Sequence, residues 1–346
     1  MNIAYIVSAL SNKGPVIVVK ELVSQFTKKG HSCTVYYFDD IVELEFDCSV
    51  FRINIKEKID FTQFDVVHTH GLRPDKYIFF NKPKFKINTL FISTVHNYVL
   101  QDFRYQYNWL VAFSFGNLWM YWLRKHDKIV TLSQDAQQYY SKWFSSDKLT
   151  YAYNTRSPDR TKKLNKEELK EVVDFKGDSV LLGVNALLSP VKGVDMLIKA
   201  LPYLPDHKLF IVGDGKSRKS LEELSQRLCV SERCYFAGYK SNAYRYLEYY
   251  DIFTMPSRSE GFPLSLLEAS VYATPSLVSN IPVIEEVFST EEVSFFDLSN
   301  PLSIVDAIKI ATASKLLGST FHNKYLNSYS PEIMYERYLA IYNREI

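Results

Sequence analysis

The chain has 346 residues, a length that predicts two domains if a domain holds roughly 100–200 residues. Hydrophobic residues make up 47% of the chain and charged residues 23%, which excludes a disordered, collagen-like or low-complexity protein. The net charge of +2 excludes a nucleic-acid binder that relies on bulk electrostatics. The charge is uneven, because residues 1–155 hold 18 basic and 14 acidic side chains, a balance of +4, and the remainder holds 23 and 25. We therefore infer partners from local sites and expect no nucleic acid among them.

The cysteines and the first residues indicate the compartment. Cys33, Cys48, Cys229 and Cys234 form no CxxC pair and no Cys/His cluster with the spacing of a zinc site, which argues against a disulfide scaffold or a structural metal. The N-terminus reads MNIAYIVSAL and lacks the basic region of a leader peptide. We therefore expect a cytoplasmic protein.

The longest apolar run is WLVAFSFGNLWMYWL, residues 109–123. It is shorter than the ~20 residues that a membrane-spanning helix needs, so we expect a buried helix. Arg124, Lys125 and Lys128 follow the run directly. The alternative is therefore an amphipathic helix that rests on an anionic membrane surface.

Apolar, β-branched runs alternate with longer amphipathic stretches, a pattern typical of βαβ units on a parallel sheet. The first helix is signalled at both ends, because Pro15 suits a first helical turn and Gly30 suits a helix end. In the first half we expect strands at 2–8, 33–38, 64–70, 87–96, 127–133 and 149–154 and helices at 15–30, 103–126 and 134–144.

A polar, charged stretch at 156–175 predicts a linker that leads into a short helix near 166–173. The alternation then restarts, with strands expected at 179–185, 207–215, 233–238, 251–257, 275–279 and 293–297 and helices at 192–200, 216–229 and 264–272. The sequence thus predicts an α/β fold with doubly wound domains at 1–155 and 176–328. A C-terminal helix at about 330–346 can pack on either domain, including back on the first.

Doubly wound domains bind ligands beyond the carboxyl ends of their strands, so the segment after the strand at 251–257 is the first candidate site. It contains Glu260 in a loop and Glu268 in the following helix. Two carboxylates suit a polyhydroxylated ligand, because each ionised carboxylate can accept several hydroxyl donors. For an isolated pair, the alternative is a solvated capping glutamate and a second glutamate on an exposed helix face.

The same segment offers a phosphate site. Gly261 lets the backbone approach a ligand, and the N-terminus of the next helix presents N–H groups and the positive end of its dipole. Pro263 has no N–H, so Phe262, Leu264 and Ser265 would supply the donors. The segment therefore combines carboxylates for hydroxyl groups with amides for a phosphate.

The order of motifs along the chain carries a family resemblance. EGFPLSLLE at 260–268 contains two glutamates eight residues apart, and it follows LLSPVKGVDMLIKAL at 187–201 and KLFIVGDGKSRKSLEEL at 208–224. Nearer the N-terminus stand DVVHTHG, STVHN and IVTLSQ. In type and order these segments resemble the retaining GT-B glycosyltransferases of family 4, with the glutamate pair corresponding to the EX7E motif.

The resemblance implies an enzyme with two Rossmann-like domains that face each other across a cleft. Such an enzyme moves a sugar from a nucleotide-diphosphate-sugar to a hydroxyl acceptor with retention at the anomeric carbon. The nucleotide-sugar is a co-substrate, so we expect no cofactor. No carboxylate suggests itself as a nucleophile, so we expect attack on the leaving-group face, with the diphosphate helping to accept the proton.

The resemblance also implies roles for individual residues. Lys192 would hold the diphosphate as a point charge, and Glu268 would hold the ribose hydroxyls. Glu260 would contact hydroxyls of the donor sugar, and the amides after Gly261 would support the β-phosphate or the sugar. His96 would face the donor sugar from the N-terminal domain.

The sequence departs from the family pattern at several places, and two of them concern residues of the predicted site. Leu187 stands where an arginine usually provides a second phosphate cation, and Arg258 and Lys216 are candidates to replace it. In the first loop, SNKGP at 11–15 retains only Gly14 of the usual glycine pair. We therefore expect Gly14 to line a loop of altered shape that receives the acceptor or a phosphate.

Other motifs point to no metal or redox cofactor. His68 and His70 alternate along a strand and could ligate a metal, but no third ligand follows from the spacing, so we favour a structural or acceptor-side role. The sequence contains no DxD motif, which argues against a metal-bridged diphosphate. Gly213 and Gly215 lack the third glycine of a nicotinamide-binding motif.

The expected partners are a UDP- or GDP-linked sugar and a saccharide acceptor. The basic first half and its aromatic helix suit a lipid-diphosphate-linked acceptor at the inner membrane, as in bacterial O-antigen or capsule synthesis, with Arg104, Arg124 and Lys125 near the membrane. A catalytically inactive, nucleotide-binding partner of another glycosyltransferase is the alternative, supported only by Leu187 and the altered first loop. A GT-B epimerase or phosphorylase is a further, weaker alternative.

Overall fold

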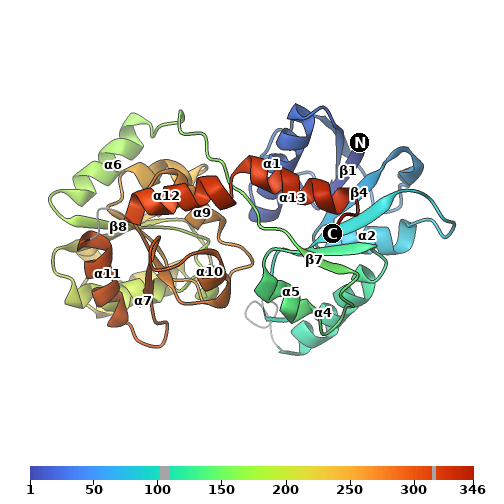
Figure 1. Cartoon of the computed structure of the whole chain (residues 1–346). Coiled ribbons are helices and arrows are strands. Elements are labelled where there is room, and N and C mark those ends of the chain that lie inside the picture. The colour runs from blue at the N-terminus through green and yellow to red at the C-terminus, as the bar shows by residue number, and fades with distance from the viewer. Residues whose placement is uncertain (102–108, 314–316) are drawn as a thin grey trace. The chain divides into compact units, whose positions relative to one another are not determined.

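The computed structural model describes residues 1–101, 109–313 and 317–346 (Figure 1). The chain forms two compact units, the first made of Met1–Arg156 with Tyr329–Ile346 and the second of Ser157–Ser328. Each unit is built on its own parallel sheet with helices on both faces. This arrangement confirms the predicted α/β fold with two doubly wound, Rossmann-like parts.

The first unit contains a seven-stranded sheet in the order β3-β2-β1-β4-β5-β6-β7. All its strand pairs are parallel, and His70 at the end of β4 pairs with Val7 at the end of β1. The order reverses between β1 and β4, which is the switch point where doubly wound sheets bind ligands. The strands are β1 (Asn2–Val7), β2 (Ser32–Tyr37), β3 (Ser49–Arg52), β4 (Val66–His70), β5 (Leu90–Thr94), β6 (Lys128–Thr131) and β7 (Leu149–Tyr151).

Helices cover both faces of the first sheet. Successive side chains of a strand point to opposite faces, so each strand contacts helices on both sides. On β4, His68 bonds to Tyr342 of α13 on one face, whereas Thr69 bonds to Asp75 of α2 on the other. The C-terminal helix α13 packs on α1 within the first unit, and the rings of Phe26 and Tyr335 lie 4.8 Å apart. The helices of this unit are α1 (Gly14–Lys28), η1 (Phe61–Gln63), α2 (Leu72–Asn81), α4 (Trp109–Leu123), α5 (Gln134–Tyr140) and α13 (Pro331–Tyr342).

The sequence reading missed β3 and α2. Strand β3 has four residues and lies at the sheet edge, so it carries little apolar signal. Helix α2 contains Pro74 and buries a carboxylate, Asp75, which accepts hydrogen bonds from Thr69 Oγ1 and from Trp119 Nε1 at 2.7 Å. A buried acid in a short helix hides the apolar periodicity on which sequence reading depends.

The expectation that residues 109–123 form a buried helix is only half right. Helix α4 buries Trp119, Met120 and Leu123 in the core of the first unit. Its opposite side exposes large apolar side chains, including Phe113 and Phe115. A helix that is apolar all round gives no sign in the sequence of which side faces the core. The predicted helix ran to residue 126, but α4 ends at Leu123 and a turn follows it, and residues 103–108 lie outside the described residues.

The second unit contains a six-stranded parallel sheet in the order β10-β9-β8-β11-β12-β13. Its switch point lies between β8 and β11, where Leu182 pairs with Ile252. The strands are β8 (Val180–Asn185), β9 (His207–Val212), β10 (Cys234–Gly238), β11 (Ile252–Met255), β12 (Ser276–Ser279) and β13 (Ser294–Phe296). The core contains Leu182, Val184, Leu209 and Ile211 from the two central strands β8 and β9.

The second unit contains three α-helices that the sequence did not predict, α10, α11 and α12. The helices are α6 (Lys166–Lys176), η2 (Pro190–Lys192), α7 (Val194–Ala200), η3 (Leu201–Tyr203), α8 (Arg218–Arg227), η4 (Ser231–Arg233), η5 (Ala243–Glu248), α9 (Leu264–Val271), α10 (Pro282–Val287), α11 (Ser303–Ala313) and α12 (Leu317–Ser328). Helix α6 confirms the short helix predicted near 166–173 at the end of the linker, and it begins at a capping box of Asn165 and Glu168. In the described parts of the chain, no helix has the length and apolar content to cross a membrane.

Candidate active site

Two charged side chains meet at the switch point of the second sheet. Lys192 follows β8, and Glu260 follows the neighbouring strand β11. The Lys192 Nζ donates to Glu260 Oε1 at 2.6 Å, and the same oxygen accepts from the Ser257 hydroxyl at 2.6 Å. The Glu260 side chain is 11% exposed and that of Lys192 is 28% exposed. The structure thus brings together two of the predicted site residues, 68 positions apart in the sequence.

Gly193 makes this meeting sterically feasible. Its backbone has φ +64°, and a Cβ built there would lie 1.8 Å from the carbonyl oxygen of Pro256. Any other residue would be strained by the left-handed backbone and would collide with the end of β11. The Arg258 N–H also donates to the Val191 oxygen at 2.7 Å, so the loops after the two strands are joined on both sides of Lys192.

Arg258 ties this region together through its side chain. Its guanidinium donates to the Pro190 carbonyl oxygen and pairs with the Asp195 carboxylate at 2.9 Å. Burial favours the neutral acid, but the hydrogen bond from Lys199 and the charge of Arg258 outweigh it and lower the pKa of Asp195. Arg258 is therefore already balanced by a carboxylate. A role for Arg258 as the substitute phosphate cation stays a prediction. The same holds for Lys216, which is exposed.

Leu187, which replaces the usual arginine, is 68% exposed beyond the end of β8. Nearby, Gly213 has a role that the sequence reading missed. A Cβ at Gly213 would lie 1.8 Å from the Ala186 carbonyl oxygen. Gly213 is needed here because any side chain would collide with the backbone of the loop after β8. It therefore allows the loop after β9 to pack against that loop.

The predicted phosphate donors lie at the start of α9. Gly261 and the buried Phe262 precede the helix, and Glu268 is half-buried within it. The Leu264 N–H donates to the Phe262 carbonyl oxygen at 2.9 Å, so one of the three predicted amide donors already has a partner in the chain. The Ser265 hydroxyl contacts the Met255 sulfur at 3.7 Å. The roles assigned to these groups remain predictions.

In the first unit, histidines gather at the carboxyl ends of β4 and β5. His96 Nε2 lies 2.8 Å from His70 Nδ1, so one ring donates and the other accepts. His68 is bound on both ring nitrogens, by Tyr342 at 2.8 Å and by Thr94 at 2.7 Å. Burial lowers the pKa of all three rings, that of His96 to about 3, so they are neutral at pH 7.

The sequence predicts a structural or acceptor-side role for His70 but gives no sign of its contact with His96. Within the described residues, no group of three or more His, Cys, Asp or Glu side chains is arranged to hold a metal. Gly14, the remaining predicted residue, begins α1.

Two family models match the chain. The model described as "Glycosyltransferase Family 4" matches residues 13–160, and the model described as "Glycosyl transferases group 1" matches residues 165–323. The chain is 32% identical to the O-antigen biosynthesis glycosyltransferase WclY of Escherichia coli, with 99% of this chain and 98% of that protein covered.

Two further comparisons are more distant. The chain is 24% identical to the UDP-Gal:alpha-D-GlcNAc-diphosphoundecaprenol alpha-1,3-galactosyltransferase of Escherichia coli, over 82% of this chain and 74% of that protein. Its structure resembles that of sucrose-phosphate synthase from Thermosynechococcus elongatus, with a TM-score of 0.81, 15% identity and 99% of both chains covered.

The two doubly wound units and the structural likeness together define the GT-B class of fold. The chain belongs to family 4 of the glycosyltransferases, and it is an enzyme of the transferase class. The resemblance drawn from its motifs is thereby confirmed. The alternative of an inactive partner protein is not favoured, because the relatives are named as glycosyltransferases.

Replacement of Gly193 by alanine should destabilise the second unit and disturb the Lys192–Glu260 pair. The added methyl group meets the Pro256 oxygen, and the backbone is strained, so we expect a loss of more than about 1 kcal/mol in the free energy of unfolding. Urea denaturation measures this loss. Gly238→Ala is the control in the same unit, because φ there is +72° and the nearest atom to a Cβ is the flexible end of the Arg218 side chain at 3.5 Å. Equal losses in both variants would show that contact with Pro256 is unimportant.

Proposed function

We propose that this enzyme transfers a sugar from a nucleoside-diphosphate-sugar to a hydroxyl group of a lipid-diphosphate-linked saccharide, with retention at the anomeric carbon. We further propose that it acts in bacterial O-antigen synthesis at the cytoplasmic face of the inner membrane. UDP is the favoured nucleotide of the donor, and no metal ion or other cofactor takes part.

The names of the relatives support the substrate classes. WclY is named for O-antigen biosynthesis and matches this chain over nearly its full length. The name of the galactosyltransferase gives UDP-galactose as its donor and a sugar on diphosphoundecaprenol as its acceptor. A nucleotide-sugar donor and a lipid-linked acceptor are therefore natural proposals for this chain.

The Lys192–Glu260 pair carries the proposal. An ammonium at the carboxyl ends of β8 and β11 can turn from the carboxylate to the diphosphate of a donor, where it would stabilise the leaving group. Glu260 and Glu268 would then accept hydrogen bonds from hydroxyls of the sugar and the ribose. At the start of α9, the Ser265 N–H and the positive end of the helix dipole would meet the β-phosphate, whereas the N–H groups of Leu264 and Leu266 already have partners in the chain.

The bond changes follow from these roles. The acceptor oxygen forms a bond to the anomeric carbon while the bond from that carbon to the diphosphate oxygen breaks. The hydroxyl proton passes to the departing diphosphate on the same face of the sugar, so the configuration is retained. Glu260 Oε1 already accepts two hydrogen bonds, which suits a carboxylate that holds hydroxyls better than one that attacks carbon.

The outer side of α4 supports contact with a membrane. Phe113 is 68% exposed and Phe115 is 55% exposed, and the exposed Arg124 and Lys125 follow the helix. Apolar rings beside basic side chains suit a surface of anionic lipids, where the rings enter the acyl boundary and the cations meet headgroups. Arg104, also proposed for this contact, lies outside the described residues.

Thermal unfolding with UDP, GDP, ADP, CMP and their sugar conjugates tests the donor site. We expect one diphosphate to stabilise the protein selectively, by about 2.7 kcal/mol at a concentration 100 times its Kd. Lys192→Ala and Glu268→Ala should abolish the effect, and added EDTA should leave it unchanged. Lys309→Ala is the control, because its exposed pair with Asp306 lies on another helix of the same unit. If no nucleotide stabilises the protein, the proposed donor site is wrong.

Sedimentation with lipid vesicles tests the membrane contact. The protein should bind vesicles that contain phosphatidylglycerol and should bind neutral vesicles more weakly. Phe113→Ser and Phe115→Ser should each weaken binding about tenfold, because each removes a ring of roughly 1.5–3 kcal/mol burial energy. Tyr239→Ser, at a 64% exposed position in the second unit, is the control. Equal binding by all four proteins would contradict the proposed surface.

A further inference from the structure

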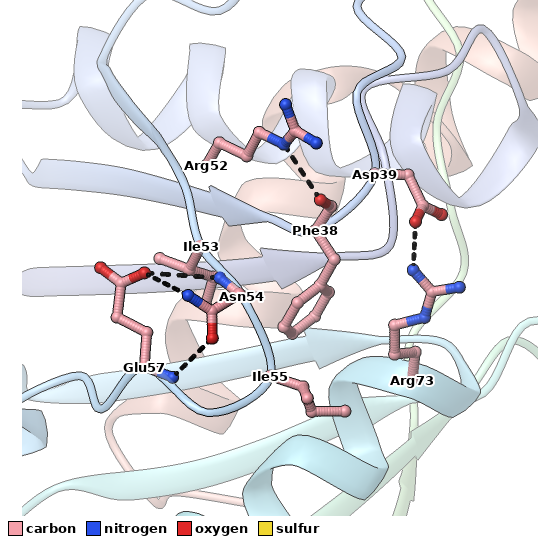
Figure 2. Close-up of a pocket in the computed structure, with 8 residues that line it drawn as sticks. All are labelled: Phe38, Asp39, Arg52, Ile53, Asn54, Ile55, Glu57 and Arg73. Carbon is pink, nitrogen blue, oxygen red and sulfur yellow. Dashed lines mark hydrogen bonds and ion pairs between the residues drawn. The ribbon is translucent and has the colours of Figure 1, made fainter.

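A pocket of about 540 Å³ opens in the first unit, and no histidine lines it (Figure 2). Its residues follow strand ends: Asp39 comes after β2, Asn54 after β3, and Arg73 lies in the first turn of α2, after β4. The pocket therefore lies at the carboxyl edge of the sheet, the edge at which doubly wound domains bind ligands and at which His96 follows β5. Its volume lies within the range of roughly 300–1,000 Å³ typical of small-molecule sites.

The pocket combines an apolar floor with polar walls. Figure 2 shows the ring of Phe38 between two polar pairs, Asn54 with Glu57 and Asp39 with Arg73. The Asn54 side-chain amide donates to Glu57 Oε2 at 3.4 Å, and the Arg73 guanidinium donates to the Asp39 carboxylate. A sugar ring has an apolar C–H face and a rim of hydroxyl groups. The aromatic ring suits the face, and the carboxylates, amide and guanidinium suit the rim.

The charges of the pocket disfavour an anion. Arg73 is paired with Asp39, and Arg52, which also lines the pocket, is paired at 2.8 Å with Asp40, which does not line it. The carboxylate of Glu57 also lines the pocket. A phosphate or uronate would have to displace a carboxylate from a guanidinium and approach Glu57, whereas a neutral sugar can donate hydroxyl hydrogens to both acids.

We propose that this pocket is a subsite for a neutral sugar residue of the acceptor saccharide. Asp39 and Glu57 accept hydrogen bonds from its hydroxyls, the remaining N–H groups of Arg73 donate to its oxygens, and Phe38 packs against its apolar face. This inference rests on the proposed function, because only a saccharide acceptor gives the first unit a sugar to bind. The pocket would then select the acceptor by its sugar, independently of any lipid that carries it.

Saturation-transfer difference NMR on the full chain tests the subsite. The probes are the methyl glycosides of glucose, galactose, mannose, N-acetylglucosamine and N-acetylgalactosamine, with glucuronate and inorganic phosphate as anionic probes. We expect one or two glycosides to bind and the anions not to compete with them. Asp39→Asn and Glu57→Gln should each weaken the binding about tenfold or more, since each removes a charged acceptor of a sugar hydroxyl.

Glu45→Gln is the control, because Glu45 is an exposed acid of the first unit and does not line the pocket. The subsite is refuted if no glycoside binds, if all three variants bind alike, or if glucuronate or phosphate binds in preference to the sugars. Stabilisation by the nucleotide is measured on the same samples. If it persists while the glycoside result is negative, only the subsite is wrong, and if both are lost the proposed function fails as well.

Discussion

The close approach of Gly193 to the Pro256 carbonyl oxygen is the constraint on which the candidate site depends. It joins the loops that follow two neighbouring strands, so that Lys192 and Glu260 meet at 2.6 Å. The backbone contact of Arg258 with Val191 holds the same two loops from the other side. The charged pair is thus positioned by the backbone of a rigid sheet, which is how a site can be preorganised before its ligand arrives.

The candidate residues of the first unit differ from the Lys192–Glu260 pair, because they are neutral histidines. His68 lies within β4, His70 ends it and His96 follows β5, and burial lowers the pKa values of all three until they carry no charge at pH 7. His96 can therefore donate or accept a hydrogen bond toward a ligand, but it brings no cation. The positive charge proposed for the leaving group comes from Lys192 in the second unit.

A feature could be predicted from the sequence when it depends on residues that are close together in the chain. Apart from β3, the strands of both sheets follow from apolar runs of a few residues, and the position of Glu260 after a strand follows from its neighbours. The contacts between Lys192 and Glu260, and between His70 and His96, span 68 and 26 positions and depend on which strands are adjacent. The spacing of residues along the chain does not give the order of strands in a sheet. The residue types of the site could therefore be predicted, but their contact partners could not.

The affinity of UDP for Glu260→Gln and Lys192→Met tests most directly whether the ammonium of Lys192 exchanges its partner when the donor binds. In that exchange, the Glu260 carboxylate competes with the diphosphate for the ammonium. Lys192→Met should therefore weaken UDP binding at least about tenfold, whereas Glu260→Gln should bind UDP as tightly as the unmodified enzyme or more tightly. Isothermal titration calorimetry measures both affinities. If Glu260→Gln loses UDP affinity to the same extent as Lys192→Met, the ammonium does not leave the carboxylate for the donor, and the proposed role of the pair is wrong.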